Sequence, residues 1–306
     1  DVTVITNSTN YEVLIEELKN NHGSTSLNFR KKMSEIAFSE TAYYDALISN
    51  YFSSKSKDIF PKKKIIFGKL IQELRYGENP HQKAAIYSKN IELKLNQLNG
   101  KELSFNNYND IFSAILISKS LPKNIGTVIV KHSNPCGVSI NKNHIQSYDF
   151  AMSSDPISAF GGIVSCNFKI KQKLAKKLNK NFFEVIIGNG IEKNALNILK
   201  KKKNLRVIDA SNLDLKNSEN IIYNFNSFLI QSSDFKTFSK KNFKIVSKKK
   251  PSSKTLKNLI FAFNVCRFVK SNGIVLVNKE STVGIGSGQP SRLDSCEIAI
   301  NKMKKF

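Results

Sequence analysis

Short apolar segments alternate with helix-like segments from about residue 65 onward, and this alternation constrains the fold more than any other feature of the chain. Segments with helical spacing lie near residues 170–179 and 191–201. Strands that alternate with helices imply a sheet covered by helices, so the sequence predicts a layered α/β fold. The expected strands comprise residues 128–130, 162–164, 185–187 and 206–208.

The first 57 residues cannot complete a sheet by themselves. Their pattern predicts one strand over residues 2–5 and helices around 11–20 and 27–53. We interpret residues 1–57 as the end of a domain whose beginning precedes residue 1. Residues 58–64 are polar and contain one proline, which is typical of a linker.

Two larger segments follow this linker, and a chain of 306 residues has room for two domains at roughly 150 residues each. Residues 65–250 comprise a first α/β unit and a connecting segment, with short strand candidates at 228–230 and 243–246. Residues 251–306 begin a second α/β unit. This second unit is expected to contain a helix with Leu256, Leu259, Ile260 and Phe263 on one face, strands over 273–277 and 282–285, and a helix from Ser291.

The chain is strongly basic, with 48 Lys and Arg residues against 24 Asp and Glu residues and a formal net charge of +24. Only five of these cations are arginine, which grips phosphate through two parallel hydrogen bonds, whereas lysine is a hydrated point charge. The lysine runs at residues 62–64, 200–203 and 248–250 contain no interleaved aromatic residue. We therefore predict no specific nucleic-acid binding, and a basic polyanion-binding protein is the weaker alternative.

Neither export nor membrane insertion is indicated. No apolar run approaches the roughly 18 residues of a spanning helix, and the N-terminus lacks a basic and then apolar leader. The four cysteines are far apart and form no Cys-x-x-Cys pair, as expected in a reducing compartment. We predict a cytoplasmic protein without a membrane segment.

Lys131 and His132 directly follow the expected strand over residues 128–130. Ligands of open α/β sheets bind outside the carboxyl ends of strands. A histidine there can accept a proton and a neighbouring ammonium can stabilise an oxyanion, so the pair suits attack by a weak amine on a carbonyl. A polar strand end followed by a turn at Asn134 and Pro135 explains the same pattern equally well.

The same stretch matches the zinc deaminase signature only in part. Asn134 stands where that signature requires a glutamate, and Cys136 is not followed by a second cysteine three residues later. We therefore predict no metal.

Residues 75–82, Arg-Tyr-Gly-Glu-Asn-Pro-His-Gln, place one of the rare arginines among turn-forming residues. Arg75 can clamp a phosphate or a carboxylate through two hydrogen bonds, which lysine cannot do. The alternative is an ordinary loop contact between Arg75 and a carboxylate side chain.

Two glycine-containing stretches could approach a ligand closely. Residues 284–292, Gly-Ile-Gly-Ser-Gly-Gln-Pro-Ser-Arg, precede the C-terminal helix, and a glycine turn that opens a helix offers N–H groups to an anion. The stretch lacks the third glycine of a dinucleotide signature, so we predict a tight turn that presents Arg292. Residues 155–162, Asp-Pro-Ile-Ser-Ala-Phe-Gly-Gly, predict either a similar close approach or a simple bend.

Taken together and in this order, these motifs resemble the bifunctional purine biosynthesis protein family. That family joins IMP cyclohydrolase to AICAR formyltransferase, where AICAR is 5-aminoimidazole-4-carboxamide ribonucleotide. The motifs that carry the resemblance lie at residues 74–82, 131–137, 154–162, 270–272 and 284–292.

The resemblance implies formyl transfer from the co-substrate 10-formyltetrahydrofolate to the 5-amino group of AICAR, followed by ring closure to IMP in another domain. By family role, His132 is the general base and Lys131 stabilises the transition state. Leu293 matches a position beside the folate. The positions that match nucleotide contacts are Arg75, Tyr76, Asn107, Gly161, Glu184, Asn272 and Arg292.

The family also implies two cytidine-deaminase-like subdomains, the end of a methylglyoxal-synthase-like domain before them, and a homodimer to which Asn107 and Glu184 contribute. Most of the cyclohydrolase domain would precede residue 1, and the family continues beyond Arg292 into a segment that completes the folate pocket. We therefore expect a chain truncated at both ends. A catalytically inactive nucleotide-binding fragment is the main alternative function.

Overall fold

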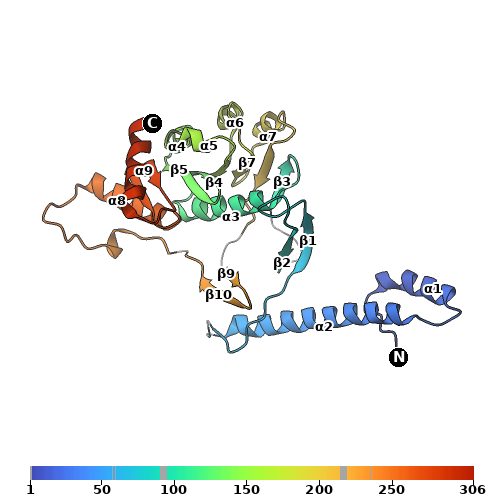
Figure 1. The fold of residues 1–306 in the computed structure, drawn as a ribbon. Helices are drawn as coiled ribbons and strands as arrows, with labels where there is room; N and C mark the ends of the chain where they lie inside the picture. Colours follow the sequence, from blue (N-terminus) through green and yellow to red (C-terminus); the bar gives the residue numbers. More distant parts are fainter. Residues whose placement is uncertain (1, 57, 59, 90–94, 214–218, 235) are drawn as a thin grey trace. The chain divides into compact units, whose positions relative to one another are not determined.

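The fold comes from a computed structural model, which describes residues 2–56, 58, 60–89, 95–213, 219–234 and 236–306. Figure 1 gives the order of the elements along the chain. The chain divides into two units, one formed by residues 1–72 and 86–92 and the other by residues 73–85 and 93–306.

The first unit is mainly helical and contains η1 (Ser8–Asn10), α1 (Tyr11–Asn20) and α2 (Leu27–Lys55). α2 begins where the hydroxyl of Ser26 accepts the N–H of Phe29 at 3.2 Å, a typical N-cap.

The helices predicted in this unit are confirmed, but the strand predicted over residues 2–5 is wrong. Residues 2–7 have no regular secondary structure. A strand needs a partner for its backbone N–H and C=O groups, and no strand in the described part of the chain pairs with this segment.

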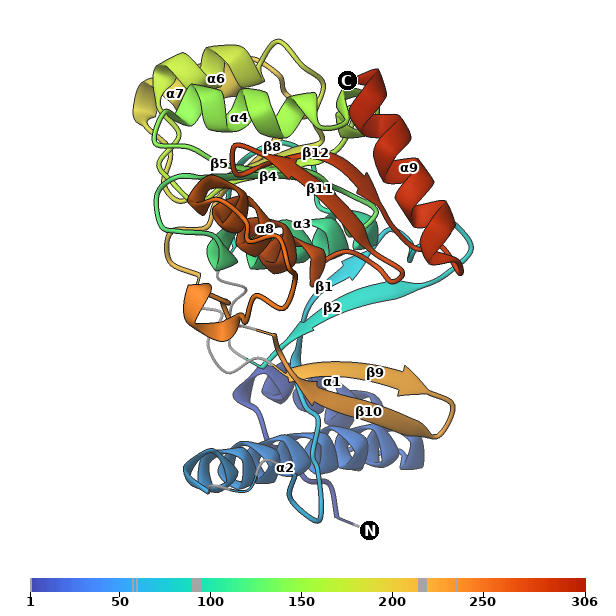
Figure 2. The ribbon, with the colours of Figure 1, turned by 90° about the vertical axis from the view of Figure 1, so that its left-hand side faces the viewer.

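An eight-stranded mixed sheet forms the centre of the second unit (Figure 2). β6, β7 and β8 are parallel to one another, and the other neighbouring strands are antiparallel. This mixed sheet with its helices confirms the α/β fold class. Across the sheet the order is β11 (Ile274–Asn278), β12 (Ser281–Gly286), β5 (Asn134–Ile140), β4 (Gly126–Lys131), β6 (Ile163–Cys166), β7 (Val185–Gly188), β8 (Arg206–Asp209) and β3 (Asn96–Asn99).

Helices cover both faces of this sheet. α4, α6 and α7 lie on one face and α3 on the other (Figures 1 and 2), while α8 packs on β11 and α9 packs on β12. The helices of this unit are α3 (Phe105–Ser120), α4 (His144–Ser153), α5 (Pro156–Ala159), α6 (Gln172–Leu178), α7 (Lys193–Leu199), α8 (Ser253–Cys266) and α9 (Arg292–Lys305).

Two small sheets stand outside the large one. β1 (Lys69–Leu74) pairs with β2 (Ala84–Ser88), and β9 (Glu219–Asn224) pairs with β10 (Ser227–Ser232). The strand predicted near 228–230 is therefore confirmed as β10. The strand predicted over 243–246 is wrong, because this segment follows the short helix η2 (Lys240–Asn242) without pairing to any described strand.

The four strands predicted from short apolar segments between residues 128 and 208 are confirmed as β4, β6, β7 and β8. β11 and β12, which belong to residues 251–306, extend the same sheet beside β5. The predicted division at residue 250 and the two deaminase-like subdomains stay predictions.

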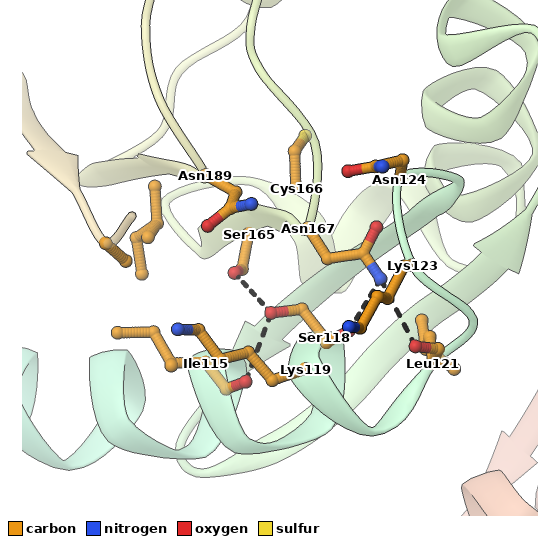
Figure 3. Close-up of a pocket in the computed structure, with 12 residues that line it drawn as sticks. Ile115, Ser118, Lys119, Leu121, Lys123, Asn124, Ser165, Cys166, Asn167 and Asn189 are labelled. Carbon is orange, nitrogen blue, oxygen red and sulfur yellow. Dashed lines mark hydrogen bonds between the residues drawn. The ribbon is translucent and has the colours of Figure 1, made fainter. Parts of the chain in front are cut away.

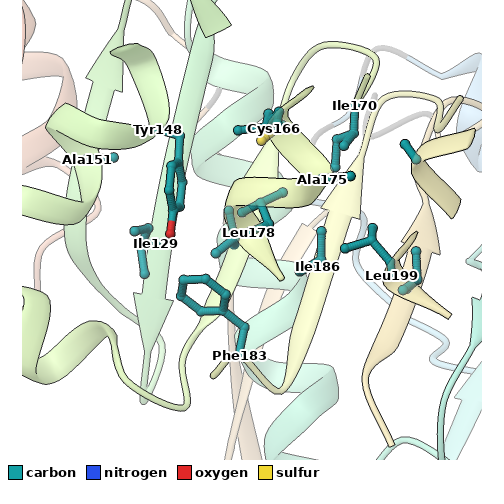
Figure 4. Packing of buried hydrophobic residues seen from close by; sticks show 14 of the residues in the cluster. Ile129, Tyr148, Ala151, Cys166, Ile170, Ala175, Leu178, Phe183, Ile186 and Leu199 are labelled. Atoms are coloured by element: carbon teal, nitrogen blue, oxygen red, sulfur yellow. The ribbon is translucent and has the colours of Figure 1, made fainter. Parts of the chain in front are cut away.

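The core lies between the sheet and the helices α4, α6 and α7 (Figure 4). Ile129 from β4, Ile186 from β7 and Tyr148 from α4 belong to this cluster, and the hydroxyl group of Tyr148 accepts a hydrogen bond from the Asn181 amide at 2.6 Å. Burial raises the pKa of Tyr148 to about 12. Full burial likewise raises the pKa of the Cys166 thiol to about 12, so this cysteine behaves as an apolar core residue.

Glycines allow α4 and α9 to lie directly against the sheet. A Cβ atom added at Gly137 in β5 would lie 1.8 Å from the carbonyl oxygen of Ala151 in α4. A Cβ atom at Gly286 in β12 would lie 1.8 Å from the carbonyl oxygen of Ser295 in α9. Gly286 was expected in a helix-opening turn that offers N–H groups to an anion. The structure places it at the end of β12, where it permits close packing.

Candidate active site

The predicted catalytic pair lies at a two-residue hairpin turn. Lys131 at the end of β4 pairs with Asn134 at the start of β5, and His132 and Ser133 form the turn between them. Both turn residues have positive φ angles, 52° and 59°, as in a type I′ turn. The alternative of a turn at Asn134 and Pro135 is wrong, because both residues belong to β5.

A carboxylate from α3 holds this turn. Asp110 accepts the backbone N–H of Ser133 at 2.6 Å through Oδ1 and that of His132 at 3.1 Å through Oδ2. Sequence reasoning missed Asp110, although it stands three residues after Asn107. Residues i and i+3 share a face of a helix, so this spacing could have indicated it.

A cavity of about 750 Å³ lies beside the turn. It opens at the carboxyl end of β4 and at the amino ends of β6, β7 and β8. The structure brings six of the predicted site residues together in its lining, namely Tyr76, Asn107, Lys131, His132, Gly161 and Glu184.

The Lys131 ammonium is fixed at one wall of this cavity. Its Nζ atom donates a hydrogen bond to the carbonyl oxygen of Phe160 at 2.8 Å. Gly161 follows with a φ of 71° and donates its N–H to the carbonyl oxygen of Phe182 at 2.9 Å. An ammonium carries three N–H groups, so two donors of Lys131 stay available for a ligand.

A polar cluster forms another wall. A capping box at the start of α3 fixes Asn107, since its N–H bonds the hydroxyl of Ser104 and its Oδ1 accepts the N–H of Ser104, each at 3.2 Å. The side-chain amide then donates to Oε2 of Glu184 at 2.8 Å. Nη1 of Arg206 lies 3.8 Å from the same oxygen.

Arg206 is a cavity residue that sequence reasoning missed. Burial lowers the pKa of its guanidinium, and the charges of Glu184 and Tyr76 act in the opposite direction. The rarity of arginine in this chain, which singled out Arg75, was the available signal.

The remaining predicted residues do not line the cavity. Arg75 is exposed, with its guanidinium carbon 5.8 Å from the centre of the Tyr76 ring. Asn272 donates to the carbonyl oxygens of Gln289 and Pro290. Arg292 and Leu293 are exposed residues in the first turn of α9.

The segment before Asn272 is nevertheless connected to the hairpin of His132 and Ser133. The backbone N–H of Lys270 donates to Oδ1 of Asn134 at 3.2 Å, and the carbonyl oxygen of Lys270 accepts the N–H of Gly288. The loops around Lys270 and Gly288 are therefore joined by hydrogen bonds to the first residue of β5.

Asp155, in the motif at residues 154–162, has a structural role. This buried carboxylate caps α5 by accepting the N–H of Ser158 at 2.9 Å, and it lies 2.7 Å from Nζ of Lys302 in α9. Burial acts to raise the pKa of Asp155, but the ammonium of Lys302 and the bonds from Ser158 outweigh it and hold the pKa below its usual range.

We expect Asp155→Asn to lower the free energy of unfolding by about 1–2 kcal/mol at pH 7. This loss is smaller than that for a fully buried ion pair, because the side chain of Lys302 is one-third exposed. Asparagine can still cap α5. Because the folded-state pKa is depressed, this stabilisation is complete above the unfolded pKa of about 3.9 and disappears as the pH falls through the folded value.

Urea unfolding of both proteins at pH 7 and pH 3 measures this difference. The difference in unfolding free energy between the two proteins should be smaller at pH 3 than at pH 7. An equal difference at the two pH values would contradict the ion-pair explanation. Asp149→Asn is the matched control, because its pair with Lys177 is exposed and should contribute at most about 0.5 kcal/mol.

A second cavity, of about 270 Å³, lies at the opposite ends of β6 and β7 beside the end of α3 (Figure 3). The hydroxyls of Ser118 and Ser165 bond each other at 2.8 Å, and the Asn167 amide donates to the carbonyl oxygen of Ser118. These polar groups satisfy one another, and the lining contains no acid–base pair. The cavity beside His132 is therefore the better candidate for chemistry.

In the described segments, no three His, Cys, Asp or Glu side chains gather closely enough to hold a metal ion. Over the same residues, no helix has the length and apolar character needed to cross a membrane.

Comparison with known proteins gives matches over the whole chain. The family model described as the AICARFT/IMPCHase bienzyme matches residues 1–302. The bifunctional purine biosynthesis protein PurH of Leptospira biflexa is 40% identical over 307 residues, which cover 100% of this chain and 60% of that protein. The PurH proteins of Thermoanaerobacter sp. strain X514 and Persephonella marina are 42% and 40% identical and cover 98% and 100% of this chain, respectively. The chain spans about 60% of the length of these relatives.

Proposed function

Because the chain belongs to the AICARFT/IMPCHase bienzyme family, we propose that its second unit carries the formyl-transfer site of that family. The reaction moves the formyl group of 10-formyltetrahydrofolate to the 5-amino group of AICAR. In the full-length gene product we also propose IMP cyclohydrolase activity and a role in purine biosynthesis, as the names of the relatives suggest.

The observation that carries the proposal is the Lys131 and His132 pair at the wall of a cavity that also contains Tyr76, Asn107 and Glu184. A base beside a cation suits attack by a weakly nucleophilic amine on a formyl carbon. The tight turn fixes both groups on a rigid hairpin.

In the proposed mechanism, His132 takes a proton from the 5-amino nitrogen of AICAR as that nitrogen bonds to the formyl carbon. Lys131 donates a hydrogen bond to the developing oxyanion. The bond between the formyl carbon and the folate nitrogen then breaks, and this nitrogen receives the proton from His132. The products are formylated AICAR and tetrahydrofolate.

The other predicted residues complete the proposal. Gly161 gives the nucleotide close access to the backbone beside Lys131, and Arg75 binds its phosphate. Asn272 and Arg292 contact the nucleotide from the C-terminal side of the turn, and Leu293 lies beside the folate. We further propose a cytoplasmic homodimer and the domain boundaries at residues 57, 64 and 250.

A formyl-transfer assay tests the proposal directly. The full-length gene product is expected to convert AICAR and 10-formyltetrahydrofolate to formylated AICAR and tetrahydrofolate. Absence of turnover in the full-length product, with AICAR binding retained, would favour the inactive nucleotide-binding alternative. Selective nucleic-acid binding that survives about 0.2 M salt would favour the polyanion-binding alternative.

We expect Arg75→Lys to weaken AICAR binding although the charge is retained, because a two-point hydrogen bond to phosphate is lost. Isothermal calorimetry should find a loss of about tenfold for AICAR and a much smaller loss for the phosphate-free nucleoside, in line with the strength of a charge-assisted bond. Equal losses of affinity for the two ligands would show that Arg75 does not bind the phosphate.

A further inference from the structure

The catalytic turn adopts a backbone conformation that its own residues disfavour. Two-residue hairpin turns with positive φ at both positions favour Asn-Gly or Gly-Gly. Here the positions are occupied by His132 and Ser133, with φ angles of 52° and 59°. The left-handed region is disfavoured for a residue with a side chain, so a contact outside the turn is needed to stabilise it.

Asp110 supplies that contact through both of its carboxylate oxygens. Oδ1 accepts the N–H and the hydroxyl group of Ser133, at 2.6 and 3.3 Å, and Oδ2 accepts the N–H of His132 at 3.1 Å. The two N–H groups point the same way because both residues are left-handed. A carboxylate that bonds both of them therefore stabilises this conformation.

A second hairpin in the same sheet provides an internal comparison. Lys279 and Glu280 connect β11 to β12 and have φ angles of 51° and 53°. The N–H of Glu280 donates to Oδ1 of Asn258 in α8 at 2.9 Å. Both turns are thus held by a polar side chain from a helix, but only the turn beside the cavity is held at both N–H groups by one carboxylate.

We propose that Asp110 is a positioning residue for the formyl-transfer site, and this inference rests on the proposed function. By holding the turn left-handed, Asp110 sets the direction in which the His132 side chain leaves the backbone. It also keeps Lys131 opposite Asn134, and Asn134 in turn bonds the N–H of Lys270. The carboxylate acts on the reaction through the backbone.

The test uses Asp110→Ala in the full-length gene product. We expect kcat for formyl transfer to fall about 10-fold to 100-fold, the scale of a misplacement of about 1 Å. KM for AICAR should change less than about threefold, because Asp110 acts through His132 and not by binding the nucleotide.

Rescue by a second substitution separates positioning from direct contact with the substrate. Glycine adopts positive φ at no steric cost, so Asp110→Ala combined with Ser133→Gly should regain at least fivefold of the lost kcat. Asn258→Ala removes the comparable support from the other turn and should leave kcat unchanged. Absence of rescue, or a kcat within threefold of wild type for Asp110→Ala alone, would overturn the inference.

A measurement without substrate separates this inference from the proposed function. Hydrogen exchange followed by NMR should show faster exchange of the Ser133 amide in Asp110→Ala, with the Glu280 amide as a reference that does not change. If His132→Ala and wild type are both inactive, the proposed function fails, and the exchange result alone decides whether Asp110 holds the turn. Unchanged exchange at Ser133 would overturn that claim.

Discussion

His132→Ala in the full-length gene product is expected to lower kcat for formyl transfer by about 10²-fold to 10⁴-fold, the usual contribution of a positioned acid–base group. The imidazole at the wall of the cavity is the proposed proton acceptor, and alanine cannot replace it. Removing the side chain also leaves the neighbouring Lys131 and Tyr76 in place, so AICAR binding should weaken far less than kcat.

Steady-state rates of tetrahydrofolate formation measure this effect. His22→Ala is the matched control, because His22 is an exposed residue of the first unit and should leave formyl transfer unchanged. A loss of less than threefold for His132→Ala would exclude it as the general base.

Gly286→Ala is expected to lower the free energy of unfolding by about 3 kcal/mol or more, at the upper end of the cost of overpacking. The added methyl group would lie 1.8 Å from the backbone carbonyl oxygen of Ser295, which no side-chain rotation can relieve. Either α9 moves away from β12 or the strand distorts, and both changes expose buried residues such as Ala299.

Urea unfolding followed by circular dichroism measures the loss. Gly288→Ala is the control within the same motif, because its nearest neighbour would be the Cδ atom of Lys270 at 4.0 Å. Its positive φ of 70° alone should cost only about 1–2 kcal/mol. Equal losses at the two positions would show that close helix packing is not the reason for Gly286.

The parallel strands could be predicted because their apolar residues are continuous and buried on both faces. β5 could not, because Pro135 and Gly137 are typical of turns. In the structure Pro135 stands at an irregularity in the pairing with β4, and Gly137 makes room for α4. Pro135 and Gly137 therefore belong to a strand because of the pairing and packing around them, which their own preference for turns does not reveal.

The candidate site could be predicted only where a residue type is informative by itself. The Lys131 and His132 pair and the scarcity of arginine were visible in the sequence, whereas the positions of Asp110 and Arg206 depend on how α3 and β8 border the cavity. His132 was expected at the carboxyl ends of the strands, and it lies at the carboxyl end of β4. Because β4 is antiparallel to β6, the cavity faces the amino ends of the parallel strands.

The order of strands across the sheet has a consequence for how the protein is made. β5 lies between β4 and β12, and the pairing of Ser139 with Ser281 joins residues 142 positions apart. At about 5–20 residues per second, a ribosome needs on the order of ten seconds to add that length. During this interval one edge of β5 lacks its neighbour, and an open edge can pair with another nascent chain. Pro135 carries no backbone N–H, so it removes one donor from the row of groups that such pairing in β5 could use.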